Sequence, residues 1–226
     1  MRIGHPRIDP ELFDLVVTTR QYPVPPGSNV VLLPVAMSRF VAPPAPTPEE
    51  RSFLGSVGRF RLVAIGGATK YWTLPVERIV DAVERPFDGT VVAVTSRRTD
   101  PAIVDRLRAM PAIRLVDGAS PRFALLLAEA AETFVTGDSV SMLSEAVLAG
   151  KPVALIPIEQ DDKGRRALGP EPQESGPSAR RRDLRRFWDY LIDEGMVGTI
   201  DDGPKRAADI PNPNAIAADA VRRLLS

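Results

Sequence analysis

Residues 133–157, TFVTGDSVSMLSEAVLAGKPVALIP, constrain the fold more than any other stretch of the sequence. The apolar runs 133–136 and 153–156 have the length of buried strands. Between them, residues 139–149 read as a helix that ends at Gly150. A helix is the usual connection between parallel strands. The stretch therefore predicts a β-α-β unit whose hydroxyl-rich turn, at the amino end of the helix, can receive an anion.

The same alternation of apolar runs and helical segments extends back to residue 61. Further strands are predicted at 61–65, 90–95 and 113–116, and further helices at 75–83, 100–109 and 121–131. Near-continuous apolar strands that alternate with helices indicate a parallel sheet covered on both faces, so the predicted fold class is α/β and Rossmann-like. Ligands of such sheets bind at the carboxyl ends of the strands, where the strand order reverses.

The first residues are organised differently from this repeat. Short apolar strands are predicted at 13–18 and 29–33, with the turn-rich QYPVPPGS and no helix between them. Proline recurs in residues 41–50, VAPPAPTPEE, so this stretch is a linker that leads into a short helix. The chain is expected to divide into residues 1–45, a small unit with its linker, and residues 46–226, a Rossmann-like nucleotide-binding domain.

The last third of the chain is polar before it becomes helical again. Residues 159–183 are rich in glycine and proline, which predicts a long loop. A helix is expected at 184–193, an edge strand at 196–200 and a terminal helix at 213–225. The acids in EQDD (159–162) can bind a metal, although a solvated loop is the simpler interpretation. The arginine run 180–182 reads as a solvated helix start or as a contact for an acidic partner or a lipid head group.

Composition excludes several classes of protein. The formal net charge is +0, and basic and aromatic residues do not interleave, so nothing favours nucleic acid as a partner. No apolar run approaches the roughly 18 residues of a membrane span. MRIGHPRIDPE lacks the apolar core of a signal peptide, so a cytoplasmic location is expected, and the excess of arginine over lysine suggests a bacterial source. Cysteine is absent and His5 is the single histidine, so no cofactor or metal site is predicted.

Three polar clusters follow strands of the predicted sheet and should meet at one edge of it. The first, GGATK, contains Gly66, Gly67, Thr69 and Lys70. Glycines let a backbone approach a ligand closely and the lysine can meet a phosphate, although a tight strand-to-helix turn would use the same residues. The cluster is neither the phosphate-binding loop GxxxxGK[ST] nor the dinucleotide fingerprint GxGxxG.

The second cluster contains Ser96, Arg97 and Arg98, followed by Thr99. Two arginines at the carboxyl end of a strand suit the oxygens of a phosphate or a uracil-type carbonyl. The alternative is a solvated loop in which Thr99 or Asp100 caps the next helix.

The third cluster belongs to the β-α-β unit at 133–157. It contains Asp138, Ser139, Ser141, Ser144 and Glu145. Ser139 is a good helix cap and can be purely structural. Glu145 distinguishes better between a binding role and a structural one. Its helix neighbours are apolar, and an unpaired buried carboxylate is costly. Two ribose hydroxyls would satisfy this carboxylate, and so would a salt bridge to an arginine.

The pattern VTGDSVSMLSEAVLAGKPV, preceded by IGGATK and TSRRT, resembles the mitochondrial fission protein family, whose bacterial members are often called nucleoside-diphosphate-sugar epimerase-like. The resemblance runs from about residue 5 (HPRIDPELFDLVVTTR) to about residue 200. The family in turn looks like the C-terminal half of GT-B glycosyltransferases of the peptidoglycan N-acetylglucosaminyl transferase type. That resemblance implies diphosphate contacts from Ser139 and Ser141 and a ribose contact from Glu145. It implies secondary contacts from Gly66, Gly67, Thr69 and Arg97.

Two residues and one segment depart from the family pattern. Gly137 stands where the family commonly has alanine, and Tyr71 stands where it commonly has histidine. Family members usually carry a further half-domain before the segment that matches His5. Residues 1–45 are therefore expected to be the remnant of an N-terminal α/β domain.

The resemblance implies a UDP-sugar-like nucleotide-binding domain of a GT-B-type glycosyltransferase-like protein that lacks most of its acceptor domain and, if active, needs no metal. The alternative is a non-catalytic interaction protein that keeps the fold as a scaffold, as the fission label implies. An NAD-dependent epimerase is rejected, because GxGxxG and a Tyr-x-x-x-Lys pair are both missing.

Overall fold

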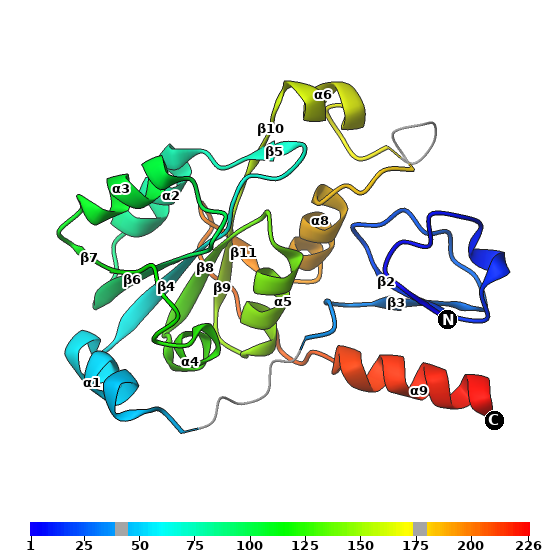
Figure 1. The fold of residues 1–226 in the computed structure, drawn as a ribbon, viewed down its shortest axis with the longest axis horizontal. Coiled ribbons are helices and arrows are strands. Elements are labelled where there is room, and N and C mark those ends of the chain that lie inside the picture. Colours follow the sequence, from blue (N-terminus) through cyan, green and yellow to red (C-terminus); the bar gives the residue numbers. More distant parts are fainter. Residues whose placement is uncertain (39–44, 174–179) are drawn as a thin grey trace.

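Six parallel strands form the largest sheet of the computed structural model, which describes residues 1–38, 45–173 and 180–226 (Figure 1). In spatial order they are β11 (Gly198–Thr199), β9 (Val153–Ile156), β8 (Glu132–Thr136), β4 (Phe60–Ile65), β6 (Thr90–Thr95) and β7 (Ile113–Val116). Each neighbouring pair is parallel. The predicted α/β class with a parallel, Rossmann-like sheet is confirmed.

The strand order reverses between β4 and β8. From β4 the chain proceeds to β6 and β7 on one side, whereas β8, β9 and β11 lie on the other. The two central strands are paired in parallel, with Ala64 opposite Val135. The loops that follow Ile65 and Thr136 therefore open on one crevice at the carboxyl edge of the sheet, which is where such folds bind ligands.

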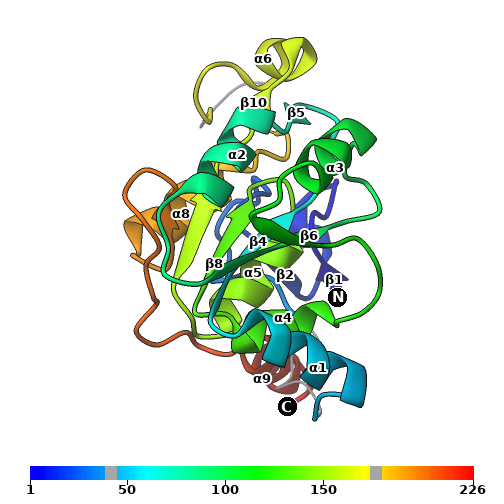
Figure 2. The same ribbon diagram turned by 90° about the vertical axis from the view of Figure 1, so that its left-hand side faces the viewer.

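Helices cover both faces of this sheet (Figure 1 and Figure 2). One face packs against α2 (Val76–Glu84) and α3 (Pro101–Arg108). The other face packs against α1 (Pro48–Val57), α4 (Phe123–Glu129), α5 (Val140–Leu148) and α8 (Arg185–Asp193). All six residues of β4 are buried, because the strand has helices on both sides.

The first residues form a second parallel sheet of β1 (Arg2–Ile3), β2 (Val16–Thr19) and β3 (Val30–Leu33). The residues between β2 and β3 form no helix, as predicted. The terminal helix α9 (Pro213–Leu225) lies along this sheet (Figure 1). Its Ala217 and Ala220 are buried together with Leu15, Val17 and Leu33. A helix from the end of the chain therefore completes the small core that its beginning builds.

The prediction of a long loop at 159–183 is wrong over its first part. β10 (Glu159–Gln160) pairs antiparallel with β5 (Trp72–Thr73), and α6 (Asp162–Leu168) follows. Asp161 caps this helix by accepting a hydrogen bond from the Gly164 N–H at 2.5 Å. The sequence pattern misses these elements because a strand of two residues has no periodicity and α6 is mostly polar. Residues 174–179 of the predicted loop, and 39–44 of the predicted linker, lie outside the described residues.

The remaining predicted elements are present with small shifts of their ends. The strand predicted at 13–18 begins at Val16, because a short 3-10 turn at Pro10–Leu12 precedes it. The edge strand predicted at 196–200 is β11. Within the described part of the chain, no helix combines the length and the apolar character that crossing a bilayer requires.

Candidate functional site

The crevice between β4 and β8 is closed by five hydrogen-bonded residues, Gly66, Gly67, Thr99, Thr136 and Asp138, which we name the crevice cluster. The Thr136 hydroxyl accepts a hydrogen bond from the Gly66 N–H at 2.8 Å and donates one to Asp138 Oδ1 at 2.7 Å. Asp138 Oδ2 accepts from the Gly67 N–H at 2.9 Å. The Thr99 hydroxyl donates to the Gly66 carbonyl at 2.6 Å. The ends of β4, β6 and β8 are therefore tied together by the protein's own groups.

Close approach of protein atoms explains both glycines of the crevice cluster. A Cβ atom at Gly66 would lie 2.1 Å from Asp138 Oδ2, and one at Gly67 would lie 2.1 Å from the carbonyl oxygen of Arg98. A side chain at either position would displace a buried carboxylate or a piece of backbone. The space that these glycines leave is filled from within the fold, as the tight-turn alternative requires.

Asp138 is the charged centre of the crevice cluster, and its side chain is fully buried. Burial raises the pKa of Asp138, and the hydrogen bonds from Thr136 and Gly67 partly oppose that rise. Arg98 Nη2 lies 4.0 Å from Asp138 Oδ2, but the Arg98 side chain is 60% exposed, so solvent weakens the attraction. The Asp138 carboxylate holds the crevice together and has no exposed surface for a ligand.

The loop after β6 is a tight turn held by hydroxyl groups. Ser96 Oγ accepts a hydrogen bond from the Arg98 N–H at 3.1 Å, and the Thr99 hydroxyl accepts one from the Ser96 N–H at 2.9 Å. Asp100 caps α3. Ser96, Thr99 and Asp100 thus have structural roles, whereas the side chains of Arg97 and Arg98 are exposed.

The amino end of α5 opens beside the crevice cluster. Ser139 caps this helix by accepting a hydrogen bond from the Met142 N–H at 3.3 Å, and Ser141 is exposed on the first turn. The helix itself cannot pair the first N–H groups, and they carry the positive end of its dipole. The third predicted cluster therefore supplies hydroxyl and N–H donors at the carboxyl edge of the sheet.

Ser144 and Glu145 lie where α5 meets the segment 34–38. Ser144 is buried, and its hydroxyl accepts a hydrogen bond from the Ala36 N–H at 3.0 Å. Glu145 is half-buried, and its Oε1 accepts one from the Ser38 hydroxyl at 3.2 Å. Burial raises the pKa of Glu145, and the Ser38 hydrogen bond lowers it in part. Among the described residues Glu145 forms no ion pair, so the arginine salt bridge considered from the sequence is not formed there.

Trp188 of α8 covers the turn between β8 and α5. Its indole N–H donates to the Gly137 carbonyl at 2.9 Å, and a Cβ atom at Gly137 would lie 2.8 Å from the indole ring. Trp188 also meets Trp72 of β5 edge to face, with ring centroids 5.1 Å apart. Glycine at position 137, where the family pattern commonly has alanine, is thus matched to the tryptophan that covers it.

Thr69 and Lys70 line a cleft of about 330 Å³, which we name the basic pocket and which has none of the other predicted site residues among its described lining residues. Its lining residues are Thr69, Lys70, Tyr71, Trp72, Arg181, Arg182 and Leu184. The Tyr71 hydroxyl accepts a hydrogen bond from Arg181 Nη1 at 2.9 Å. Sequence reasoning misses this pocket, because Tyr71 and Arg181 are distant in the chain. The arginine run at 180–182 is the signal that pointed toward it.

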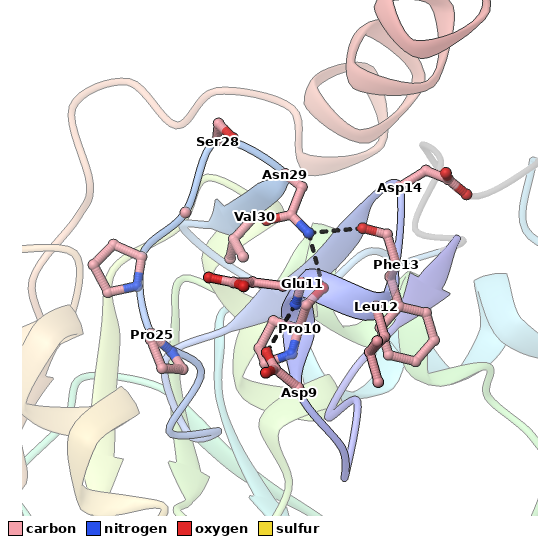
Figure 3. A pocket seen from close by; sticks show the side chains of 12 residues that line it. Asp9, Pro10, Glu11, Leu12, Phe13, Asp14, Pro25, Ser28, Asn29 and Val30 are labelled. Atoms are coloured by element: carbon pink, nitrogen blue, oxygen red, sulfur yellow. Dashed lines mark hydrogen bonds between the residues drawn. The ribbon is translucent and has the colours of Figure 1, made fainter.

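Another cleft, of about 570 Å³, opens at one end of the N-terminal sheet (Figure 3). The Asn29 amide donates to the carbonyls of Pro10 at 2.8 Å and Phe13 at 2.7 Å, which joins the two loops that border it. Asp9 accepts a hydrogen bond from the Glu11 N–H at 3.0 Å. These polar groups serve local structure, and across residues 1–38, 45–173 and 180–226 no group of three or more His, Cys, Asp or Glu could hold a metal ion.

The two remaining sequence candidates also serve local structure. His5 Nδ1 accepts a hydrogen bond from the Arg7 N–H at 3.0 Å, and its ring meets Tyr22 edge to face at 5.6 Å. Asp161, one of the acids in EQDD, is the cap of α6. The solvated or structural alternative therefore accounts for both.

A family model described as mitochondrial fission ELM1 matches residues 1–223. No curated protein matches the chain. Similar solved structures include UDP-GlcNAc 2-epimerase from Neisseria meningitidis bound to UDP-GlcNAc, with 15% identity, a TM-score of 0.39, and coverage of 73% of this chain and 44% of that one. The glycosyltransferase VinC in complex with DTDP has 19% identity and a TM-score of 0.41, with coverage of 93% of this chain and 52% of that one. The chain spans about half the length of these structures.

Proposed function

This chain belongs to the mitochondrial fission ELM1 family, and we propose that it binds a nucleoside-diphosphate sugar of the UDP-sugar type at the carboxyl edge of its large sheet. The diphosphate would lie at the amino end of α5, and the ribose would lie beside Glu145. Ser139, Ser141 and the exposed guanidinium groups of Arg97 and Arg98 would supply donors to the phosphate oxygens.

The observation that carries this proposal is that the Glu145 carboxylate is half-buried and has few hydrogen-bond donors among the described residues. A half-buried carboxylate normally has a cationic partner or several hydrogen-bond donors, because removing its charge from water is costly. Within the described residues it accepts one hydrogen bond, from Ser38, and burial raises the pKa of Glu145. The two hydroxyls of a ribose would each donate to this carboxylate and offset the cost of its burial.

The crevice cluster limits where the phosphates can lie. Because Thr136, Gly67 and Asp138 satisfy one another, the diphosphate would stay outside them, at the first turn of α5. An ionised Asp138 so near that turn would repel the phosphates. Arg98, which lies 4.0 Å from Asp138, would compensate both negative groups.

The proposal covers binding of the sugar nucleotide. In a transfer reaction, the dipole of α5 and the nearby arginines would stabilise the leaving diphosphate without a metal ion. Transfer would also need an acceptor site and a general base, and we assign neither to a residue of this chain.

Isothermal titration calorimetry with UDP and with UDP-GlcNAc tests the proposal. We expect the wild-type chain to bind, and Glu145→Gln to bind about tenfold more weakly or worse, because a lost hydrogen bond to a charged group costs roughly 1.5–3 kcal/mol. The matched control is Glu129→Gln, which makes the same change at an exposed position of α4. Absence of heat with either nucleotide, in a chain that unfolds at its normal temperature, would contradict the proposal.

A second candidate function, that of an interaction protein, is favoured by the exposed apolar side chains. Within the described residues, the large hydrophobic side chains that are exposed all belong to the N-terminal unit or to the end of α9: Met1, Ile3, Ile8, Leu12, Leu32, Leu224 and Leu225. A surface that meets another protein would expose apolar side chains of this kind. Cross-linking of a specific partner by the wild-type chain but not by Leu12→Asp, together with no nucleotide binding, would favour this function.

A further inference from the structure

The basic pocket concentrates positive charge without a compensating acid. Lys70, Arg181 and Arg182 line it, and among the described residues its lining contains no aspartate or glutamate. In the part of the chain that the structure describes, none of these three side chains forms an ion pair. Like charges held in one cleft repel one another, so an anion that joins them would be stabilised.

Arg185, from the same segment, shows how this fold treats a structural arginine. Its Nη2 lies 2.7 Å from Asp183 Oδ2, and its Nη1 donates to the Gly169 carbonyl at 3.1 Å. Its side chain is only 13% exposed. Arg181, in contrast, is exposed and donates to the uncharged hydroxyl of Tyr71. The charge of Arg185 is balanced inside the fold, and that of Arg181 is not balanced by any described residue.

The pocket is held in shape before any ligand arrives. The Tyr71 carbonyl accepts a hydrogen bond from the Asp161 N–H at 3.1 Å, and Trp72 pairs with Gln160 in the β5–β10 ribbon. Lys70 Nζ lies 5.0 Å from the centre of the Tyr71 ring. Hydrogen bonding by Lys70 lowers the pKa of the Tyr71 hydroxyl, burial partly opposes this shift, and hydrogen bonding by Arg181 adds to it.

One wall of the pocket is apolar. Trp72 and Leu184 are both buried and both line it. Trp72 contacts Trp188, which in turn covers Gly137 at the start of α5. This tryptophan pair connects the basic pocket to the candidate nucleotide site while leaving the two with different lining residues.

We propose that the basic pocket binds a phosphate monoester, with Lys70, Arg181 and Arg182 donating to its oxygens and the body of the ligand against Trp72 and Leu184. A monoester near neutral pH carries close to two negative charges and three acceptor oxygens, which suits three cations lining one cleft better than a carboxylate does. The ligand can be a soluble phosphorylated sugar or the head group of a phosphorylated lipid. The inference does not rest on the proposed nucleotide site.

Intrinsic fluorescence of the full chain tests this inference, because both of its tryptophans, Trp72 and Trp188, lie at or beside the pocket. The soluble probes are inorganic phosphate and glucose 1-phosphate. The lipid probes are phosphatidylcholine vesicles that contain phosphatidic acid, a monoester, or phosphatidylglycerol, a diester. The variants are Arg181→Ala and Lys70→Met, and the matched control is Arg180→Ala, which alters the same arginine run outside the pocket lining.

We expect saturable binding that each pocket variant weakens about tenfold, because each removes one charge-assisted hydrogen bond, while Arg180→Ala binds normally. A response to the soluble probes identifies a free phosphate ester, and a response to phosphatidic acid vesicles alone identifies a lipid head group. No saturable response to any probe, a response to phosphatidylglycerol vesicles as strong as that to phosphatidic acid vesicles, or equal binding by all variants would overturn the inference. UDP titration of Arg181→Ala keeps the two sites distinguishable, because nucleotide affinity should be unchanged.

Discussion

The crevice cluster and the basic pocket are near neighbours, yet they balance charge in opposite ways. In the crevice cluster both oxygens of Asp138 accept hydrogen bonds, and their donors belong to the protein. In the basic pocket, Lys70, Arg181 and Arg182 have no ion-pair partner among the described residues. A buried polar group needs hydrogen-bond partners within the fold itself, whereas an exposed cation is solvated by water until a ligand binds. A polar group whose hydrogen bonds are all made within the protein therefore stabilises the structure and contributes little to ligand binding.

Of the substitutions that test this comparison, removal of the Asp138 carboxylate from the crevice cluster should cause the largest loss of stability. Asp138→Ala leaves the Gly67 N–H and the Thr136 hydroxyl buried without their acceptor, so we expect a loss of about 2–4 kcal/mol in the free energy of unfolding. Urea denaturation measures this loss. Asp138→Asn is the control, because it keeps the shape and one carbonyl acceptor, and it should lose less. A loss in Asp138→Ala as small as that of an average surface substitution would show that the cluster does not hold the crevice closed.

Arginine substitutions sharpen the contrast between balanced and unbalanced charge. Arg185→Ala leaves the buried Asp183 without its cation, so we expect about 2 kcal/mol of destabilisation. Arg181→Ala should leave the free energy of unfolding unchanged or slightly raised, since a repelling charge is removed from an exposed position. Urea denaturation of both variants gives the comparison. Equal destabilisation by the two would mean that Arg181 is also a structural arginine.

The smallest expected effect is the dependence of stability on pH through Asp138. The folded state raises the pKa of Asp138 above its ordinary value of 3.8, so the folded protein holds this proton more readily than the unfolded chain. The corresponding stability is fully present below the unfolded pKa and is lost as the pH rises through the folded pKa. The wild type should therefore lose stability relative to Asp138→Asn over that window. Parallel pH profiles for the two proteins would contradict the assignment of a raised pKa.

Much of the fold was predictable because its signals are local. Each strand of the large sheet except the two-residue β11 coincides with an apolar run, and α5 begins after the serine that caps it. The elements that were missed, β5, β10 and α6, are too short or too polar to have a pattern of their own. β5 and β10 form because two segments from distant parts of the chain pair with each other.

The sequence by itself determined that this chain forms a parallel α/β sheet with polar loops at one edge. The spacing of apolar residues and the capping of helices depend only on residues that are close in the sequence. The tertiary structure alone decided which of those polar groups have hydrogen-bond partners within the protein. Asp138 meets Gly67 across 71 positions of the chain, and Arg181 meets Tyr71 across 110. Such contacts depend on how strands and helices pack, and no local pattern records them. For the same reason Asp138, chosen from the sequence as a ligand contact, lies sealed in the crevice, while the arginine run at 180–182 contributes two side chains to an open pocket.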